Sequence, residues 1–192
     1  MSVIETDVED AADMARLAAG HDVALDALME RHAGPVFGFL CRFVQDEESA
    51  NDLAQETFVR IYRHRGEFRA GQRFSPWLFT IAANLARNHL RSRSRRPEVP
   101  LEDPAHPVKL PADFRPSPDE EAQQVERWAA VRTAVAELPP ELREAVALCE
   151  LDDRPLAEAA LVTGTTVKAI ESRLYRARQQ LRQRLARWLA TA

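Results

Sequence analysis

The chain has 192 residues, of which 45% are hydrophobic and 29% charged, a composition typical of a soluble globular protein with one or two domains. Its net charge of −4 argues at first against a protein that binds nucleic acid. The sequence has no signal-peptide pattern and no run of 18 apolar residues, so we expect a cytoplasmic protein with no membrane insertion. It also has no Cys/His cluster, so we expect no metal and no cofactor. Cys41 and Cys149 are expected to be buried small hydrophobic residues.

Charge is distributed unevenly along the chain. Residues 1–58 carry 13 acids and three bases, whereas residues 59–97 carry ten bases and one acid. Residues 98–126 are acidic again, and residues 127–192 are basic. The total therefore hides two basic segments that suit nucleic acid, and 24 of the 26 bases are arginine, whose planar fork fits phosphate. The opposite charges of neighbouring segments also favour the hypothesis that the chain packs into a closed state.

Three helices are predicted in the N-terminal part, over residues 22–44, 49–65 and 75–95, because apolar residues recur there at helical spacing. A bend is expected in the first helix at Gly34-Pro35. In the third helix, Ser75 is the expected N-cap, with Pro76 at the first helical position. The β-branched alternation of strands is missing, so the fold class is all-α.

An acidic motif lies in the second of these helices. Asp52, Gln55 and Glu56 fall at positions i, i+3 and i+4 and therefore share one face, near Arg60. Neither a metal ligand nor a paired acid accompanies them, so no catalytic residue is expected. Two interpretations stay open: a solvated helix face, or a docking surface for a basic partner.

Arginine, aromatic and amide side chains are interleaved from residue 59 to residue 96. Such a mixture suits single-stranded nucleic acid, because bases stack on rings while guanidinium groups hold phosphates. One stripe of the third helix, opposite its apolar face, holds Trp77, Asn84, Asn88 and Arg91. The alternative for Trp77 is an ordinary core position.

A proline-rich linker divides the chain. Seven of the 12 prolines fall between Pro97 and Pro118, and this stretch is acidic and lacks apolar periodicity. The predicted organisation is two small helical domains, at residues 1–96 and 119–192, joined by a linker at 97–118.

The C-terminal domain is predicted to contain four helices and a helix-turn-helix. The helices are expected at residues 119–137, 140–150, 155–162 and 166–188. Gly164 can adopt the positive φ of a tight turn, and Thr165 or Thr166 can cap the last helix. We expect the inward face of that helix to hold Val167, Ile170 and Leu174. The alternative is an amphipathic hairpin with a solvated arginine face.

The chain resembles a bacterial RNA polymerase sigma factor of the extracytoplasmic-function (ECF) group of the sigma-70 family. Residues 52–58 resemble the D-L-x-Q-E-x-F motif of region 2, and residues 74–84 its promoter-melting part. Residues 138–143 and 172–178 resemble region 4, which reads the −35 element. The matched segments follow one another in the order of that family.

The resemblance implies a non-enzymatic factor that carries core RNA polymerase to promoters, reads their −10 and −35 elements and helps to open the duplex. Its implied partners are the β′ coiled coil and β flap of core polymerase, promoter DNA and a cognate anti-sigma factor. The implied core-binding residues are Asp52, Leu53, Gln55, Glu56 and Phe58. The implied −10 DNA contacts are Arg65, Arg69, Phe74, Trp77, Asn84, Arg87, Asn88 and Arg91. The implied −35 contacts are Thr165, Thr166, Lys168, Glu171, Ser172, Arg173 and Arg176.

Glu171 departs from the family pattern, in which a basic residue is common. A carboxylate there can accept a hydrogen bond from a cytosine amino group, so we expect a different −35 preference. Two other functions are alternatives. A helix-turn-helix repressor or activator leaves the segments 52–58 and 59–96 unexplained. An enzyme acting on nucleic acid lacks a nucleophile–base pair, a metal cluster or a phosphate loop.

Overall fold

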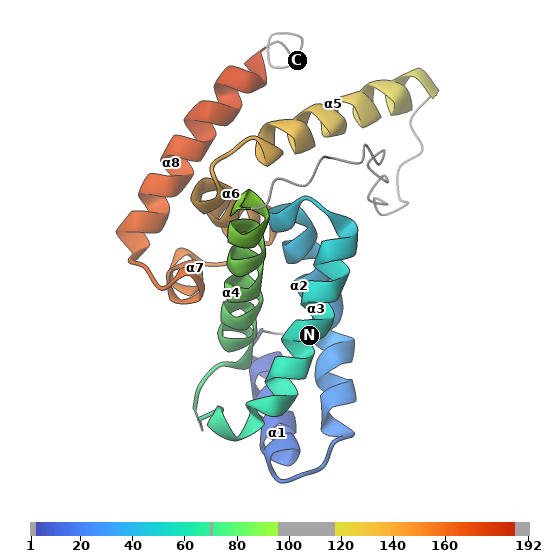
Figure 1. The fold of residues 1–192 in the computed structure, drawn as a ribbon, viewed down its shortest axis with the longest axis vertical. Helices are drawn as coiled ribbons and strands as arrows, with labels where there is room; N and C mark the ends of the chain where they lie inside the picture. Colours follow the sequence, from blue (N-terminus) through green and yellow to red (C-terminus); the bar gives the residue numbers. More distant parts are fainter. Residues whose placement is uncertain (1–2, 70, 96–117, 187–192) are drawn as a thin grey trace.

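The computed structural model describes residues 3–69, 71–95 and 118–186, which form helices and contain no β-strand (Figure 1). The N-terminal domain holds α1 (Val3–Ala18), α2 (Ala24–Val44), α3 (Glu47–Arg63), the 3₁₀ turn η1 (Arg65–Glu67) and α4 (Phe74–Arg95). The C-terminal domain holds α5 (Pro118–Ala136), α6 (Pro140–Val146), the π-helical turn η2 (Ala147–Leu151), α7 (Leu156–Thr163) and α8 (Val167–Arg184). The predicted linker lies outside the described residues, apart from Pro118.

Helix α2 runs unbroken from Ala24 to Val44, with Pro35 inside it. A proline ring normally collides with the Cβ atom of the preceding residue when that residue is helical. Here the preceding residue is Gly34, which has no Cβ atom and faces open space. The glycine therefore allows the proline to lie inside the helix.

The predicted cap of α4 is wrong. The helix begins at Phe74, so Ser75 and Pro76 lie inside its first turn. The Ser75 hydroxyl accepts a hydrogen bond from Arg154 Nη1 at 2.9 Å, so it links α4 to the other domain.

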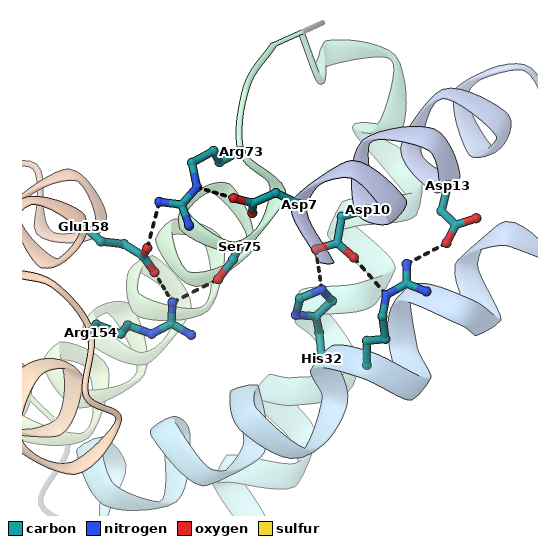
Figure 2. Close-up of polar contacts among 9 residues, drawn as sticks. Asp7, Asp10, Asp13, His32, Arg73, Ser75, Arg154 and Glu158 are labelled. Atoms are coloured by element: carbon teal, nitrogen blue, oxygen red, sulfur yellow. Dashed lines mark hydrogen bonds and ion pairs between the residues drawn. The ribbon is translucent and has the colours of Figure 1, made fainter. Parts of the chain in front are cut away.

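Helix α1 was not predicted from the sequence, and it is held by buried charged side chains. Asp10 is fully buried, with Arg31 Nε 2.9 Å from its Oδ1 atom and His32 Nε2 2.7 Å from its Oδ2 atom. Arg31 also donates to Asp13 Oδ2 at 2.6 Å. Figure 2 shows Asp10, Asp13 and His32 in this cluster. These bonds satisfy carboxylates that would otherwise be costly to bury. They fix α1 against α2.

The two domains share a continuous apolar core. Fully buried residues such as Phe39, Phe43 and Phe79 fill the N-terminal domain, and Leu148 and Ile170 lie in the core of the C-terminal one. The cores meet where α4 packs against α7 and where α2 packs against α6 and η2. Figure 1 shows α7 beside α4. Within the residues described, no helix has the length and apolar character needed to cross a membrane.

Candidate functional sites

The acidic face of α3 is built on a capped helix. Asp46 accepts the backbone N–H of Ser49 at 3.1 Å, and this hydrogen bonding lowers the pKa of the Asp46 carboxyl. Asp52 and Gln55 are exposed, and Glu56 is partly exposed. Glu56 accepts from Arg60 Nε at 2.8 Å, which lowers the pKa of its carboxyl. The charged groups of this motif therefore point toward solvent.

Apolar residues complete the same helix. Leu53 is half-buried and Phe58 is 4% exposed, so the Phe58 ring supports the motif from within the core. Val59 was missed by the sequence analysis, although it is exposed and lies seven residues after Asp52. This i, i+7 spacing places it on the acidic face and was the signal available in the sequence.

An aromatic cluster lies at the start of α4. Phe74 is 1% exposed, and its ring is packed edge-on against His32 (5.1 Å between centroids) and Phe68 (6.1 Å). Trp77 is half-buried, with its ring 5.2 Å from that of Phe68. The Phe74 ring is thus part of the core, whereas part of the Trp77 ring reaches the surface.

Beyond this cluster, α4 presents the predicted polar stripe. Asn84, Asn88 and Arg91 are exposed. Arg87 donates to Asn84 Oδ1 at 2.5 Å, and Arg91 donates to Asn88 Oδ1 at 2.7 Å. The amides and guanidinium groups therefore form one hydrogen-bonded row along the helix.

The two arginines before α4 differ in their surroundings. Arg65 is half-buried over the ring of Tyr62, 4.4 Å from its centroid, and donates to the Tyr62 carbonyl at 2.7 Å. Arg69 is exposed near the loop that precedes α4. Only the second is freely accessible from solvent.

The helix-turn-helix forms as predicted. Gly164 has φ 66° and ψ 33°, the left-handed conformation that glycine adopts at the lowest cost. The turn closes with hydrogen bonds from Gly164 N to Leu161 O (3.2 Å) and from Thr165 N to Ala160 O (2.9 Å). Thr166 caps α8, with its hydroxyl accepting from Ala169 N at 3.2 Å.

The faces of α8 are largely as expected. Ile170 and Leu174 are buried, but Val167 is 40% exposed, so its predicted inward position is wrong. Val167 is the first residue of α8, and the buried residues of the helix are Ile170, Leu174 and Ala177. Ala177 therefore takes the third inward position. Exposed candidates for DNA contact are Thr166, Lys168, Glu171, Ser172 and Arg176. Half-buried ones are Thr165, whose hydroxyl lies 3.0 Å from that of Thr163, and Arg173.

Arg173 and Arg87 line one cleft, although they belong to different domains. The cleft has a volume of about 490 Å³ and also contains Phe43, Arg91 and Glu144. Arg87 Nη1 donates to Glu144 Oε1 at 2.5 Å. Burial raises the pKa of the Glu144 carboxyl, an effect that the nearby Arg87 and Arg173 oppose. This pairing of Arg87 with Glu144 was not predicted from the sequence.

A second set of contacts links the domains. Arg73 binds Glu158 Oε2 at 3.3 Å and Asp7 Oδ2 at 2.8 Å, so it connects α7 to α1 (Figure 2). Arg154 pairs with Glu158, and its guanidinium carbon lies 3.3 Å from the centroid of the Phe79 ring. These residues surround the N-terminal end of α4. Among the described residues, no cluster of three or more His, Cys, Asp or Glu could hold a metal ion.

Comparison with known families decides what this arrangement is. The Sigma-70 region 2 model matches residues 28–96, and the Sigma-70, region 4 model matches residues 128–181. The chain belongs to the sigma-70 family. Its relatives include sigma factors of the ECF group, which identifies it as an ECF-type sigma factor that acts in promoter-specific initiation of transcription by RNA polymerase.

Two relatives match over almost their whole length. The RNA polymerase sigma-H factor of Pseudomonas aeruginosa is 34% identical over 184 residues, which cover 92% of this chain and 93% of that protein. The ECF RNA polymerase sigma-E factor of Haemophilus influenzae is 30% identical over 180 residues, with coverages of 92% and 95%. The solved structure of CnrH in complex with the cytosolic domain of CnrY is similar with a TM-score of 0.68 and 26% identity, covering 93% of this chain and 97% of CnrH.

These matches assign the elements of the sigma factor. Region 2 begins within α2, so α1 precedes the matched residues and yet binds region 2 through Asp7 and Asp10. Region 4 contains α6, α7 and α8, and therefore the helix-turn-helix. The acidic face of α3 and the polar stripe of α4 both belong to region 2.

Proposed function

We propose that this sigma factor docks on core RNA polymerase through α3 and reads promoters through α4 and α8, without catalysing a covalent step itself. The observation that carries the proposal is the separation of exposed charge: the α3 face is acidic, whereas the exposed faces of α4 and α8 hold arginines and amides. The proposed organisation is a region 2 domain at residues 1–96, a linker at 97–118 and a region 4 domain at 119–192. The protein acts in the cytoplasm, where bacterial polymerase works.

Core docking uses the exposed face of α3. Asp52, Gln55 and Glu56 supply hydrogen-bond acceptors and negative charge for a basic partner, which in this family is the β′ coiled coil. Half-buried Leu53 and exposed Val59 add an apolar contact, while Phe58 holds the helix from the core side. Region 4 provides a second attachment, to the β flap.

Reading of the −10 element uses the α4 stripe. Asn84, Asn88 and Arg91 are exposed and can bind bases and phosphates of an unpaired strand, and Trp77 offers a partly exposed ring for stacking. Arg65, Arg69 and Arg87 add positive charge along the strand. The buried Phe74 ring acts by supporting Trp77.

Reading of the −35 element uses the N-terminal half of α8 in the major groove. Lys168, Ser172 and Arg176 are exposed and suit phosphates and base edges. Glu171 can accept from a cytosine amino group. Thr165 and Thr166 lie at the helix N-terminus, where free backbone N–H groups favour a phosphate. Arg173 is the proposed base-reading arginine.

We also propose an anti-sigma protein as a partner. The cleft between the domains is lined by apolar groups as well as by charges of both signs, which suits an amphipathic segment of another protein. CnrH, a relative in fold, is found in complex with the cytosolic domain of CnrY. An interaction screen against membrane-anchored regulators of the same genome tests this partner.

Run-off transcription with purified core polymerase and a promoter library tests the main proposal. We expect transcripts from a subset of promoters, and Asp52→Lys with Glu56→Lys should abolish co-purification with core. Asp26→Lys with Glu30→Lys is the matched control, because these acids are also exposed one helical turn apart, on α2. Absence of transcripts, or binding to duplex operators without polymerase, would show that the chain acts by another mechanism.

A further inference from the structure

Helix α1 precedes the residues that match region 2, yet it packs against η1 and the start of α4. The residues on its inward face follow one another at three- and four-residue intervals. They are Asp7, Asp10, Met14 and Leu17. Met14 and Leu17 lie in the apolar core, whereas each of the two acids binds a polar side chain next to the start of α4.

The first acid binds the residue that directly precedes α4. Asp7 Oδ2 accepts from Arg73 Nε at 2.8 Å, and Figure 2 shows the two side chains meeting. Arg73 Nη1 also lies 3.3 Å from Glu158 Oε2, but the bond to Asp7 is the shorter of the two and stays within the N-terminal domain. The side chain of Asp7 is 28% exposed, so water only partly screens this pair.

The second acid acts through a histidine. Asp10 Oδ2 lies 2.7 Å from His32 Nε2, and the Asp10 side chain is 1% exposed. Arg31 donates to the other oxygen of Asp10 at 2.9 Å, so the carboxylate cannot turn away from His32 without breaking this bond. The rings of His32 and Phe74 meet with 5.1 Å between centroids and an interplanar angle of 62°, a favoured aromatic geometry. Asp10 therefore fixes the ring on which the first residue of α4 rests.

Phe74 passes this support on to a ring that reaches the surface. It packs against Phe68 and Trp77, with 6.1 and 6.2 Å between centroids. The Trp77 ring also contacts that of Phe68 at 5.2 Å and is half-buried. Because close-packed side chains transmit strain, a displaced His32 ring shifts the surface on which an unpaired base would stack.

We propose that α1 is a positioning element for promoter opening, which acts through Asp7 and Asp10. Asp7 holds the residue before α4, and Asp10 holds Phe74 through His32. The inference rests on the proposed function, because it takes the start of α4 as part of the −10-reading surface. A surface that is already ordered captures an unpaired strand with less loss of conformational entropy, so opening of the duplex becomes more favourable.

The test compares Asp7→Asn and Asp10→Asn with the matched control Glu9→Gln. Each variant removes one negative charge from α1, but Glu9 is exposed. Hydrogen exchange of the full-length protein reports on the order of peptides that run from η1 to the first turn of α4. We expect these peptides to exchange faster in both aspartate variants, whereas peptides of α3, and all peptides of the control, exchange as in the wild-type protein.

Promoter opening by the complex with core polymerase gives the functional readout. A promoter recovered by run-off transcription carries a fluorescent base analogue in its −10 element, and its emission rises when the bases unpair. We expect Asp10→Asn to slow opening by about two- to tenfold, the range that corresponds to one aromatic pair. Asp7→Asn should slow it by at most about fivefold, as for a partly exposed ion pair. Binding to core polymerase should not change, because the α3 face is untouched.

A double-mutant cycle tests the Asp7 contact separately from Asp10, whose complete burial makes Asp10→Asn the more disruptive variant. The cycle combines Asp7→Asn with Arg73→Ala. If Asp7 acts through Arg73, Asp7→Asn has no further effect on opening in the Arg73→Ala protein. An equal slowing in both backgrounds contradicts the contact.

Unchanged opening by both aspartate variants overturns the inference and leaves the sigma function intact, even if exchange becomes faster. Slower opening with an equal loss of core binding also overturns it, because the defect then comes from unfolding. If the wild-type protein opens no promoter with core polymerase, the proposed function itself fails, and the role assigned to α1 fails with it.

Discussion

The turn of the helix-turn-helix offers a quantitative test of how the recognition helix is held. Gly164 has φ 66°, and a Cβ atom built there meets no other atom within 4 Å. Gly164→Ala therefore adds no clash, and its effect comes from the backbone alone. The left-handed conformation costs an L-residue about 1–2 kcal/mol, while alanine stabilises the fold by about 0.4–1 kcal/mol by restricting the unfolded chain. The expected net loss is about 1 kcal/mol, or roughly fivefold in the folding equilibrium of the C-terminal domain.

Urea unfolding and amide hydrogen exchange of peptides from α7 and α8 measure this loss. Gly66→Ala is the control, because Gly66 also faces open space but has no positive φ, so alanine there should be neutral or slightly stabilising. Gly164→Asn should lie between wild type and alanine, since asparagine tolerates the left-handed region better. If Gly164→Ala exchanges as slowly as wild type, or if Gly66→Ala loses as much stability, the backbone explanation of the turn is wrong.

Three further outcomes are expected. Asp46→Ala should lower the free energy of unfolding by about 1 kcal/mol at neutral pH, because it removes the cap of α3. The folded-state pKa of Asp46 lies below its usual 3.8, so the stabilisation by the Asp46 carboxylate is fully present above pH 3.8 and is lost as the pH falls through the lowered pKa. Thermal melts from pH 7 to pH 2 measure this loss. Cys41 and Cys149 are partly buried, rather than fully buried as predicted. This burial raises the pKa of the Cys41 thiol to about 11 and that of Cys149 in the same direction. A disulfide-exchange reagent should therefore label the native protein slowly at pH 7.5, and rapid labelling would contradict this account of the two thiols. Arg173→Ala should weaken binding to promoter DNA by about 1–3 kcal/mol, through one base pair of the −35 element, if the guanidinium group reads a base. A selection from randomised −35 sequences tests this, and an unchanged sequence preference would assign Arg173 to another role.

Much of the fold could be predicted because helix formation depends on nearby residues. The spacing of apolar residues predicted the ends of α2, α3, α4 and α8 to within a few residues of the ends found in the structure. The cap at Thr166 and the turn at Gly164 depend on hydrogen-bond partners three to five positions away in the sequence. Residue types at short spacing were therefore sufficient to predict both.

Where prediction failed, the cause was usually a distant partner. The inward face of α1 holds Asp10 and Asp13 beside Met14 and Leu17, so the sequence there lacks the regular apolar spacing of an amphipathic helix. The two carboxylates can be buried because Arg31 and His32 of α2 hydrogen-bond to them. Ser75 has the side chain of a typical cap, but its hydroxyl is bonded to a residue of the other domain instead.

The sequence by itself determined the all-α character, the proline-rich division of the chain, the acidic motif and the helix-turn-helix, since each rests on residue type and short spacing. Tertiary structure alone decided which of these side chains are accessible. Arg87 meets Glu144 across 57 residues, Arg73 meets Glu158 across 85, and Arg42 meets Asp152 across 110. Spacing cannot reveal such pairs, because they exist only when separately formed helices pack and bury their charges together.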